Sequence, residues 1–201
     1  MNTEQITLKT YSKIAANYTA HRRKYKFWTE EYQTFKKFLK GKKILDVGSG
    51  SGREAEFFLR DKFDYLGTDA SPAMIKQAKK LVPKGKFRLM NMLSLKFPKK
   101  SFDGFWAAAS LLHIPKKKQS TVLKSLHKIL KDDGVGFISL KFGTGEGLFT
   151  DKTGYKRFFS YHSLPSFKKI LKQNSFNVIK SGTKKHPERK ERWLMFFVKK
   201  A

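Results

Sequence analysis

Two acids and three glycines in the first third of the chain have the types and spacing to bind a cofactor. An apolar run ends at Asp46, and Gly48, Gly50 and Gly52 follow at alternate positions before a segment of helical periodicity. Glycine lets the backbone approach a ligand closely, and the start of a helix favours a carboxylate or a phosphate. Asp69 ends the next apolar run, where a carboxylate can accept hydrogen bonds from both hydroxyl groups of a ribose. The pattern predicts a site for a cofactor that contains a nucleoside.

The glycine spacing separates two kinds of nucleoside cofactor. Dinucleotide loops follow G-x-G-x-x-G and seat a pyrophosphate on the helix start, whereas this loop is G-x-G-x-G with Asp46 two positions before it. A carboxylate repels a pyrophosphate but attracts the ammonium and sulfonium groups of S-adenosylmethionine (SAM). The charges therefore favour SAM. The alternative is a tight turn between strand and helix without a ligand, and the pairing of Asp46 with Asp69 weighs against it.

The segments around these residues predict a parallel sheet wrapped by helices. From residue 41 onward, short apolar runs alternate with longer segments of helical periodicity. We expect strands at 42–47, 65–68, 86–90, 102–107 and 134–140, and helices at 53–60, 73–81 and 116–131. Ser71 before Pro72 predicts a helix start, and Gly134 predicts a left-handed helix terminator.

Different patterns flank this core. Two amphipathic helices are expected at 7–21 and 28–39, and a helix at 163–172 precedes two strands, 176–179 and 193–198, which should pair as an antiparallel hairpin at the sheet edge. The segment 141–162 has no clear periodicity, and such segments are usually functional or mobile. We predict one domain, with a helical cap (1–40), a cofactor-binding core (41–141), an acceptor-side insert (142–162) and a C-terminal helix and hairpin (163–201).

The composition restricts the classes of function. The chain has 201 residues, no cysteine and a formal net charge of +28, so disulfides, thiolate metal sites and cysteine nucleophiles are excluded. No signal-like or membrane-spanning stretch is seen, and we expect a cytoplasmic protein. The lysines are spread along the chain, which favours a generally basic surface; a nucleic-acid partner is the alternative.

The chain resembles the class I SAM-dependent methyltransferases, in the small and broadly distributed branch. The resemblance lies in residues 44–69, in Phe102-Asp103-Gly104-Phe105-Trp106 and in Leu111-Leu112-His113-Ile114-Pro115. It implies a Rossmann-like α/β fold: a mostly parallel, seven-stranded sheet with an antiparallel C-terminal hairpin strand and helices on both faces.

The resemblance also implies roles for individual residues. Asp46, Gly48, Ser49, Gly50 and Gly52 would hold the methionine part of SAM, and Asp69 the ribose. The adenine ring would meet the Met92 backbone amide, with Ala70 and Met74 packing nearby. Asn91 stands where many members have an acid, and its carbonyl can still accept from the adenine amino group. Ala107, with Ala108, Ala109 and Ser110 after it, would face the methyl group. Tyr18, with Tyr11, would belong to an aromatic helix over the cofactor; a row along one helix face is the alternative for these tyrosines.

The acceptor side is less defined. His113 could act as a general base, but a histidine that packs between Leu112 and Pro115 is favoured. The insert holds Lys141, Glu146, Tyr155, Arg157, Phe159 and Tyr161. Lys141 and Arg157 could pair with an acidic small molecule, although surface charges are the favoured interpretation. The absence of an Asn-Pro-Pro-aromatic run argues against adenine-type amine methylation.

We therefore expect a SAM-dependent methyltransferase that acts on a small-molecule acceptor, with no metal ligand and no membrane contact. An RNA methyltransferase that uses the basic surface is the first alternative. A non-catalytic nucleic-acid or interaction module is the second, and nothing in Asp46, Gly50 or Asp69 suggests such decay. The oligomeric state does not follow from the sequence.

Overall fold

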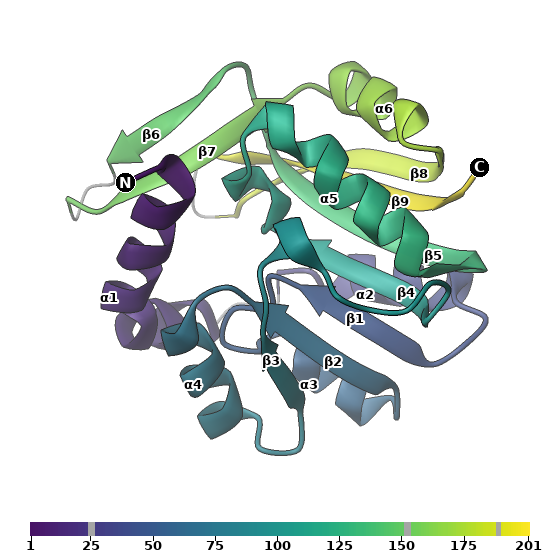
Figure 1. Cartoon of the computed structure of the whole chain (residues 1–201), viewed down its shortest axis with the longest axis horizontal. Helices are drawn as coiled ribbons and strands as arrows, with labels where there is room; N and C mark the ends of the chain where they lie inside the picture. The colour runs from purple at the N-terminus through teal and green to yellow at the C-terminus, as the bar shows by residue number, and fades with distance from the viewer. Residues whose placement is uncertain (24–26, 151–153, 188–189) are drawn as a thin grey trace.

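The computed structural model describes residues 1–23, 27–150, 154–187 and 190–201, which form an α/β fold around one sheet (Figure 1). Within these residues the sheet has nine strands, in the order β3-β2-β1-β4-β5-β7-β6, with β9 on β5 and β8 on β9. The strands are β1 (Lys43–Val47), β2 (Asp64–Asp69), β3 (Lys86–Leu89), β4 (Phe102–Ala108), β5 (Leu130–Phe142), β6 (Glu146–Thr150), β7 (Lys156–His162), β8 (Phe176–Lys185) and β9 (Arg192–Lys200).

Helices cover both faces of this sheet, with α5 in front and α2 and α3 behind in Figure 1. They are α1 (Thr3–Arg23), α2 (Thr29–Phe38), α3 (Ala55–Arg60), α4 (Pro72–Leu81), α5 (Lys116–Ile129) and α6 (Leu164–Gln173), with 3-10 turns at Met92–Ser94 and Leu111–His113. Aromatic rings fill the core: Trp106 stacks on Phe137 at a centroid distance of 4.0 Å. None of the described helices is long and apolar enough to cross a membrane.

The parallel strands β3, β2, β1 and β4 place the candidate cofactor residues at one edge of the sheet. Val47 pairs with Thr68, so the glycine loop after β1 lies beside Asp69 at the end of β2. The Gly48 and Ser49 amides both donate to the Thr68 carbonyl, at 2.7 and 2.9 Å. Ser71 caps α4, where its hydroxyl accepts from the Met74 amide, and Pro72 follows at the first turn as expected.

The predicted fold class is confirmed, and the predicted seven strands are too few. The insert, expected without regular structure, forms the antiparallel hairpin β6–β7, apart from residues 151–153, which lie outside the described residues. Most residues of β6 are exposed while the centre of β7 is buried. Because neither strand alternates regularly between buried and exposed positions, the sequence lacks a period-two signal there.

The prediction for Gly134 was wrong. The helix ends at Ile129, and Gly134 lies inside β5 without a left-handed conformation. A side chain at Gly134 would meet the Leu130 side chain and would lie 3.0 Å from the Asp103 carbonyl oxygen. This glycine therefore serves close packing between β5 and its surroundings, rather than ending the helix.

The C-terminal hairpin forms as expected, with longer strands. The strands β8 and β9 pair antiparallel, and β9 pairs antiparallel with residues 135–141 of β5. The last residues of β5, Lys141 and Phe142, pair with β7 in the parallel sense. The long strand β5 therefore joins the cofactor half of the sheet to the hairpin β6–β7.

Candidate functional site

An open cleft of about 1060 Å³ lies where the parallel strands end. Its walls come from the glycine loop, from the residues that follow β2, β3 and β4, and from α1. In open α/β sheets, ligands bind in this position, outside the carboxyl ends of the strands. The lining residues from the core are Gly48, Ser49, Gly50, Ser51, Arg53, Glu54, Asp69, Ala70, Met74, Met90, Asn91, Met92, Ala108, Ala109, Ser110, His113 and Ile114.

Two properties of the loop after β1 require glycine: a left-handed backbone conformation and the lack of room for a side chain at Gly48. Gly48 and Gly50 have φ of 74° and 55°, in the left-handed region that side chains other than glycine rarely adopt. A side chain at Gly48 would collide with Ser110, whereas the position beyond Gly50 is open. The loop therefore leaves room for a ligand next to the backbone at Gly50.

Asp69 is fixed by the backbone around it. One carboxylate oxygen accepts from the Gly50 amide at 2.9 Å, and the other accepts from the Ser71 amide at 2.8 Å. Burial raises the pKa of Asp69, and these amide donors oppose that rise. Each oxygen keeps a further lone pair. Asp69 can therefore accept hydrogen bonds from the two hydroxyl groups of a ribose in the cleft.

Asp46 lies beneath the glycine loop and does not line the cleft. It is 2% exposed, and the Tyr65 hydroxyl donates to its carboxylate at 2.7 Å. Burial raises the pKa of Asp46 well above its usual value, and the charges of Glu54 and Asp69 raise it further. Asp46 can therefore act on a ligand through its charge but not through direct contact.

Two other predicted cofactor residues also lie off the cleft. Gly52 packs against the Phe87 ring, which a side chain at this position would meet at 2.7 Å. Ala107 is 1% exposed inside β4, and its neighbours Ala108 and Ala109 line the cleft instead. Side chains alternate between the two sides of a strand, so moving by one residue along β4 changes what the side chain faces.

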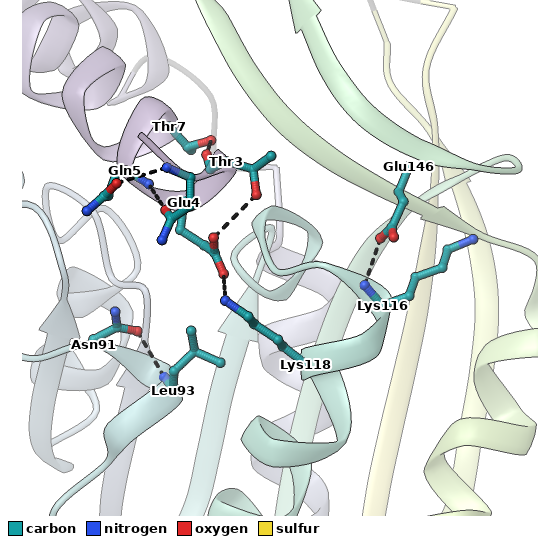
Figure 2. A network of polar contacts seen from close by, with 10 residues as sticks. Thr3, Glu4, Gln5, Thr7, Asn91, Leu93, Lys116, Lys118 and Glu146 are labelled. Atoms are coloured by element: carbon teal, nitrogen blue, oxygen red, sulfur yellow. Dashed lines mark hydrogen bonds and ion pairs between the residues drawn. The ribbon is translucent and has the colours of Figure 1, made fainter.

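Met90, Asn91 and Met92 line the cleft, and so do Met74 and Ala70. The side-chain oxygen Oδ1 of Asn91 accepts from the Leu93 amide at 2.9 Å and so caps the 3-10 turn that starts at Met92 (Figure 2). The Asn91 side chain thus has a local structural role in addition to the predicted contact with an adenine amino group.

Two charged lining residues were not singled out from the sequence, whereas Ala109 belongs to the run that was expected to face the methyl group. Arg53 and Glu54 form an ion pair at the start of α3 and line the cleft. Ala109, with φ of 54°, lines it as well and donates its amide to the Ser139 hydroxyl at 2.8 Å. A charged pair directly after a glycine loop was visible in the sequence, whereas the strained conformation of an alanine was not.

The helix α1 forms one side of the cleft and brings Tyr18 and Tyr11 to it. The two rings meet edge to face with centroids 5.3 Å apart. Near the start of α1, the Lys118 ammonium donates to Glu4 at 2.6 Å (Figure 2), and Thr7 accepts from the Phe158 amide at 2.9 Å. These contacts fix α1 to α5 and β7. Glu4, Thr7 and Leu8 also line the cleft, and the sequence analysis named none of them.

His113 is held as a neutral ring of defined tautomer. Its Nδ1 lies 2.7 Å from the Phe158 carbonyl oxygen, which can only accept, so Nδ1 carries the proton. Its Nε2, 2.8 Å from the Tyr11 hydroxyl, accepts from that hydroxyl. Burial lowers the pKa of His113 to about 3, and the charges of Arg157 and Lys141 lower it further. A group with this pKa is a poor proton acceptor at neutral pH, which supports the interpretation of His113 as a packing residue.

A second cavity, partly open to solvent, adjoins the cleft, with which it shares Tyr11, Tyr18, Arg53, Ala109 and His113. Three insert residues named from the sequence, Lys141, Arg157 and Phe159, line it, and so do Phe27, Trp28, Leu112, His186, Glu191 and Trp193. The ammonium of Lys141 lies 4.3 Å from the centre of the Phe159 ring. The structure therefore places both cations in a cavity wall, contrary to the favoured interpretation as surface charges.

The other insert residues lie outside both cavities. Glu146 accepts from the Lys116 amide at 2.7 Å (Figure 2), Tyr155 is exposed and Tyr161 is partly buried in β7. Within the described part of the chain, no group of three or more His, Asp or Glu side chains is arranged to hold a metal ion.

Comparisons with known proteins agree on one family. Residues 44–134 match the methyltransferase domain family. A 2-methyl-6-phytyl-1,4-hydroquinone methyltransferase of Synechocystis is 32% identical over 47% of this chain and 30% of its own length. A demethylmenaquinone methyltransferase of Symbiobacterium thermophilum is 26% identical over 89% of this chain and 72% of its own length. The matched regions thus range from less than a third to more than two thirds of these relatives.

A solved structure matches nearly the whole chain. It is the Burkholderia thailandensis 1,6-didemethyltoxoflavin-N1-methyltransferase with bound 1,6-didemethyltoxoflavin and S-adenosylhomocysteine (SAH). Its TM-score is 0.81 at 18% identity, and the match covers 98% of this chain and 88% of that one. At this identity the comparison shows a common fold, which includes the cap helix α1 and the hairpin β6–β7 because the match spans almost every residue.

Proposed function

Because the chain belongs to the class I methyltransferase family, we propose that it transfers a methyl group from SAM to a small organic acceptor. The observation that carries the proposal is the position of Asp69. Its carboxylate lines the cleft, is held by the Gly50 and Ser71 amides, and stands beside a glycine loop with open space at Gly50. This arrangement suits a ribose with an amino-acid chain attached, which is the shape of SAM.

The charges near the loop support a cationic ligand rather than a pyrophosphate. Asp46, Asp69 and Glu54 all lie near it; the charges of Glu54 and Asp69 raise the pKa of Asp46, and the charge of Arg53 lowers it. Three carboxylates attract the ammonium and sulfonium groups of SAM and repel a pyrophosphate. The cofactor residues we propose are the predicted ones that line the cleft, namely Tyr18, Gly48, Ser49, Gly50, Asp69, Ala70, Met74, Asn91 and Met92, with Asp46 acting from beneath.

The chain's contribution to the reaction is mainly alignment. Bound SAM supplies a methyl group that is already activated on its sulfonium. The protein has to bring the acceptor atom in line with that methyl group and exclude water. Ala109 and His113 lie where the cleft and the second cavity meet, so the acceptor would approach there. With a pKa of about 3, His113 positions the Tyr11 hydroxyl rather than taking up a proton.

A small acceptor fits the second cavity, which is bounded by buried aromatic rings such as Trp28 and Trp193. The relatives named for hydroquinone, menaquinone and toxoflavin derivatives are in keeping with such an acceptor. An RNA acceptor is the second candidate, favoured by the net charge of +28. A basic surface alone produces salt-sensitive binding to RNA. Support for an RNA acceptor therefore requires methyl transfer to RNA in addition to such binding.

Calorimetric titration with SAM, SAH and NADPH tests the cofactor. We expect SAM and SAH to bind with Kd of about 1 to 100 μM and NADPH not to bind. Asp69→Ala should weaken SAM binding about tenfold or more, since a charge-assisted hydrogen-bonding group is lost. Asp64→Ala is the matched control, because Asp64 lies at the other end of β2 in an exposed ion pair with Lys86. Absence of binding by both SAM and SAH would refute the proposal.

A further inference from the structure

The second cavity has walls suited to a flat ring. Aromatic side chains line it from several elements: Tyr11 and Tyr18 from α1, Phe159 from β7, Trp193 from β9, and Phe27 and Trp28 before α2. Trp28 and Trp193 meet edge to face with centroids 5.7 Å apart, and Phe27 packs on both. Aromatic walls favour a planar aromatic ligand, which gains offset-stacked and edge contacts.

The charged residues of this wall are mainly cationic. Lys141, Arg157 and Arg53 line the cavity, and Glu191 is the one carboxylate among the described lining residues. The side chain of Lys141 is 15% exposed and donates to Glu191 at 2.8 Å, which uses one of its three N–H groups. The guanidinium of Arg157 lies 5.4 Å from the centre of the Phe159 ring. Both cations therefore lie near the same ring in the cavity wall.

Trp193 offers an independent indication of a ligand. It is 5% exposed and lines the cavity, yet its indole N–H has no acceptor among the residues that the structure describes. Buried donors are nearly always paired with a protein group or an ordered water, so a ligand oxygen that reaches this N–H after a small shift of the wall would complete its hydrogen bonding. An indole N–H can only donate, so the missing group is an acceptor such as an oxygen.

Resting on the proposed function, we propose that the methyl acceptor is a planar aromatic compound with an anionic oxygen group, bound by Lys141, Arg157 and Trp193. The carboxylate or phenolate oxygen receives hydrogen bonds from these donors, and the ring lies among the aromatic walls. Charge-assisted hydrogen bonds then give both affinity and orientation.

A cationic methyl acceptor bound by Glu191 agrees less well with the charged residues of the second cavity than an anionic one does. Glu191 is already held by Lys141. A cation placed beside it would also lie near Lys141 and Arg157, and like charges in a partly buried site repel strongly. Binding of an amine in preference to an acid would therefore overturn the proposal.

Three probes with one ring system separate these cases: 2-naphthoate, 2-naphthamide and 2-naphthylmethylamine, titrated calorimetrically into the protein saturated with SAH. We expect the carboxylate to bind about tenfold or more tightly than the amide, and the amine to bind weakest. Similar affinities for acid and amide, preference for the amine, or no binding of any probe would refute the anionic acceptor. The preceding SAH titration tests the proposed function separately, because absence of SAH binding refutes that function itself.

Variants of the wall identify the groups that recognise the anion. Lys141→Gln and Trp193→Phe should each lower the affinity for 2-naphthoate about tenfold, leave that for 2-naphthamide within about threefold, and leave SAH binding unchanged. Trp193→Phe keeps an aromatic ring and removes only the N–H donor and part of the ring area. Lys168→Gln, at an exposed position of α6, is the matched control for loss of one positive charge. Equal losses for acid and amide in both variants would contradict the proposal.

Discussion

Asp46 is a buried carboxylate that the fold keeps at a cost in stability. Its folded-state pKa is raised, so ionisation of this carboxyl disfavours folding; the cost is absent below the unfolded-state pKa and grows as the pH rises toward the raised folded-state pKa. We predict that Asp46→Asn raises Tm at pH 7 by about 2 to 4 °C and weakens SAM binding about tenfold, since the negative charge is lost. Calorimetric melting and titration measure the two effects.

Asp103 is a control residue because its pKa is shifted in the opposite direction to that of Asp46. It accepts from the Lys43 amide and pairs with Lys131 at 2.7 Å, and its pKa is lowered. Its ionised form therefore stabilises the fold above the unfolded-state pKa, and this stability is lost as the pH falls through the lowered folded-state pKa. Asp103→Asn should lower Tm and leave SAM binding unchanged. A fall in Tm for Asp46→Asn would contradict our account of Asp46.

The second residue-scale prediction concerns the protonation of His113. Because its pKa is lowered to about 3, the ring should stay neutral across the range from about pH 5 to 8. NMR of the imidazole signals, with His113 assigned by its loss in His113→Gln, should show constant shifts over this range and a proton on Nδ1. A titration midpoint near the ordinary histidine value of about 6.5 would instead favour a general base.

The site residues that could be predicted from the sequence are those at the ends of strands and in the glycine loop. Gly48, Gly50 and Asp69 follow from the glycine spacing and the acid at the end of the second strand, and all three line the cleft. Asp46 and Ala107 do not, because the side of a strand that a residue faces depends on the neighbouring strands. Of the residues that line the second cavity, the sequence singled out Lys141, Arg157 and Phe159 but not Trp193, which meets Lys141 only through the pairing of β5 with β9.

At the scale of elements, α1 determines how closed the cleft is. Thr7 accepts from the Phe158 amide, and Thr10 donates to the Lys156 carbonyl at 2.6 Å, so two hydroxyls fasten the helix to β7. We predict that the double variant Thr7→Val/Thr10→Val raises the Kd of SAH about tenfold, since each lost hydrogen bond also leaves a backbone group unpaired. Limited proteolysis should show faster cleavage within α1.

Thr121→Val, at an exposed position of α5, controls for the loss of a threonine hydroxyl. It should change neither the Kd of SAH nor the cleavage rate. If the double variant also left both unchanged, α1 would not be a cover whose attachment affects cofactor binding.

The helices and strands predicted most accurately are those whose boundaries are marked by nearby residues in the sequence. Ser71 and Pro72 mark the start of α4, and alternation of apolar runs with helical segments marks β1 to β4. The hairpin β6–β7 has no such signal, because its burial depends on α1 packing on β7. The long extension of β5 to Phe142 likewise depends on β9 and β7, both distant in sequence.

At the scale of the whole molecule, the net charge of +28 makes the folded state repel itself. Salt screens this repulsion, so we predict that Tm rises as NaCl increases from about 0.05 to about 0.5 M. The variant Lys168→Glu/Lys169→Glu, in exposed positions of α6, should raise Tm at low salt and have little effect at high salt. A salt-independent Tm would show that local ion pairs already offset the excess charge.

The packing of α1 on β7 also sets an order for folding during synthesis on the ribosome. The helix is made before β7, and its partners Lys156 and Phe158 follow about 150 residues later, which at about 5 to 20 residues per second is a delay of roughly 8 to 30 s. Through that interval the strands β1 to β5 can already pair while the cleft lacks its cover. The helix α1 therefore leaves the ribosome before its partners on β7 but reaches its place only with them, and the nascent cleft can admit the nucleoside before it closes.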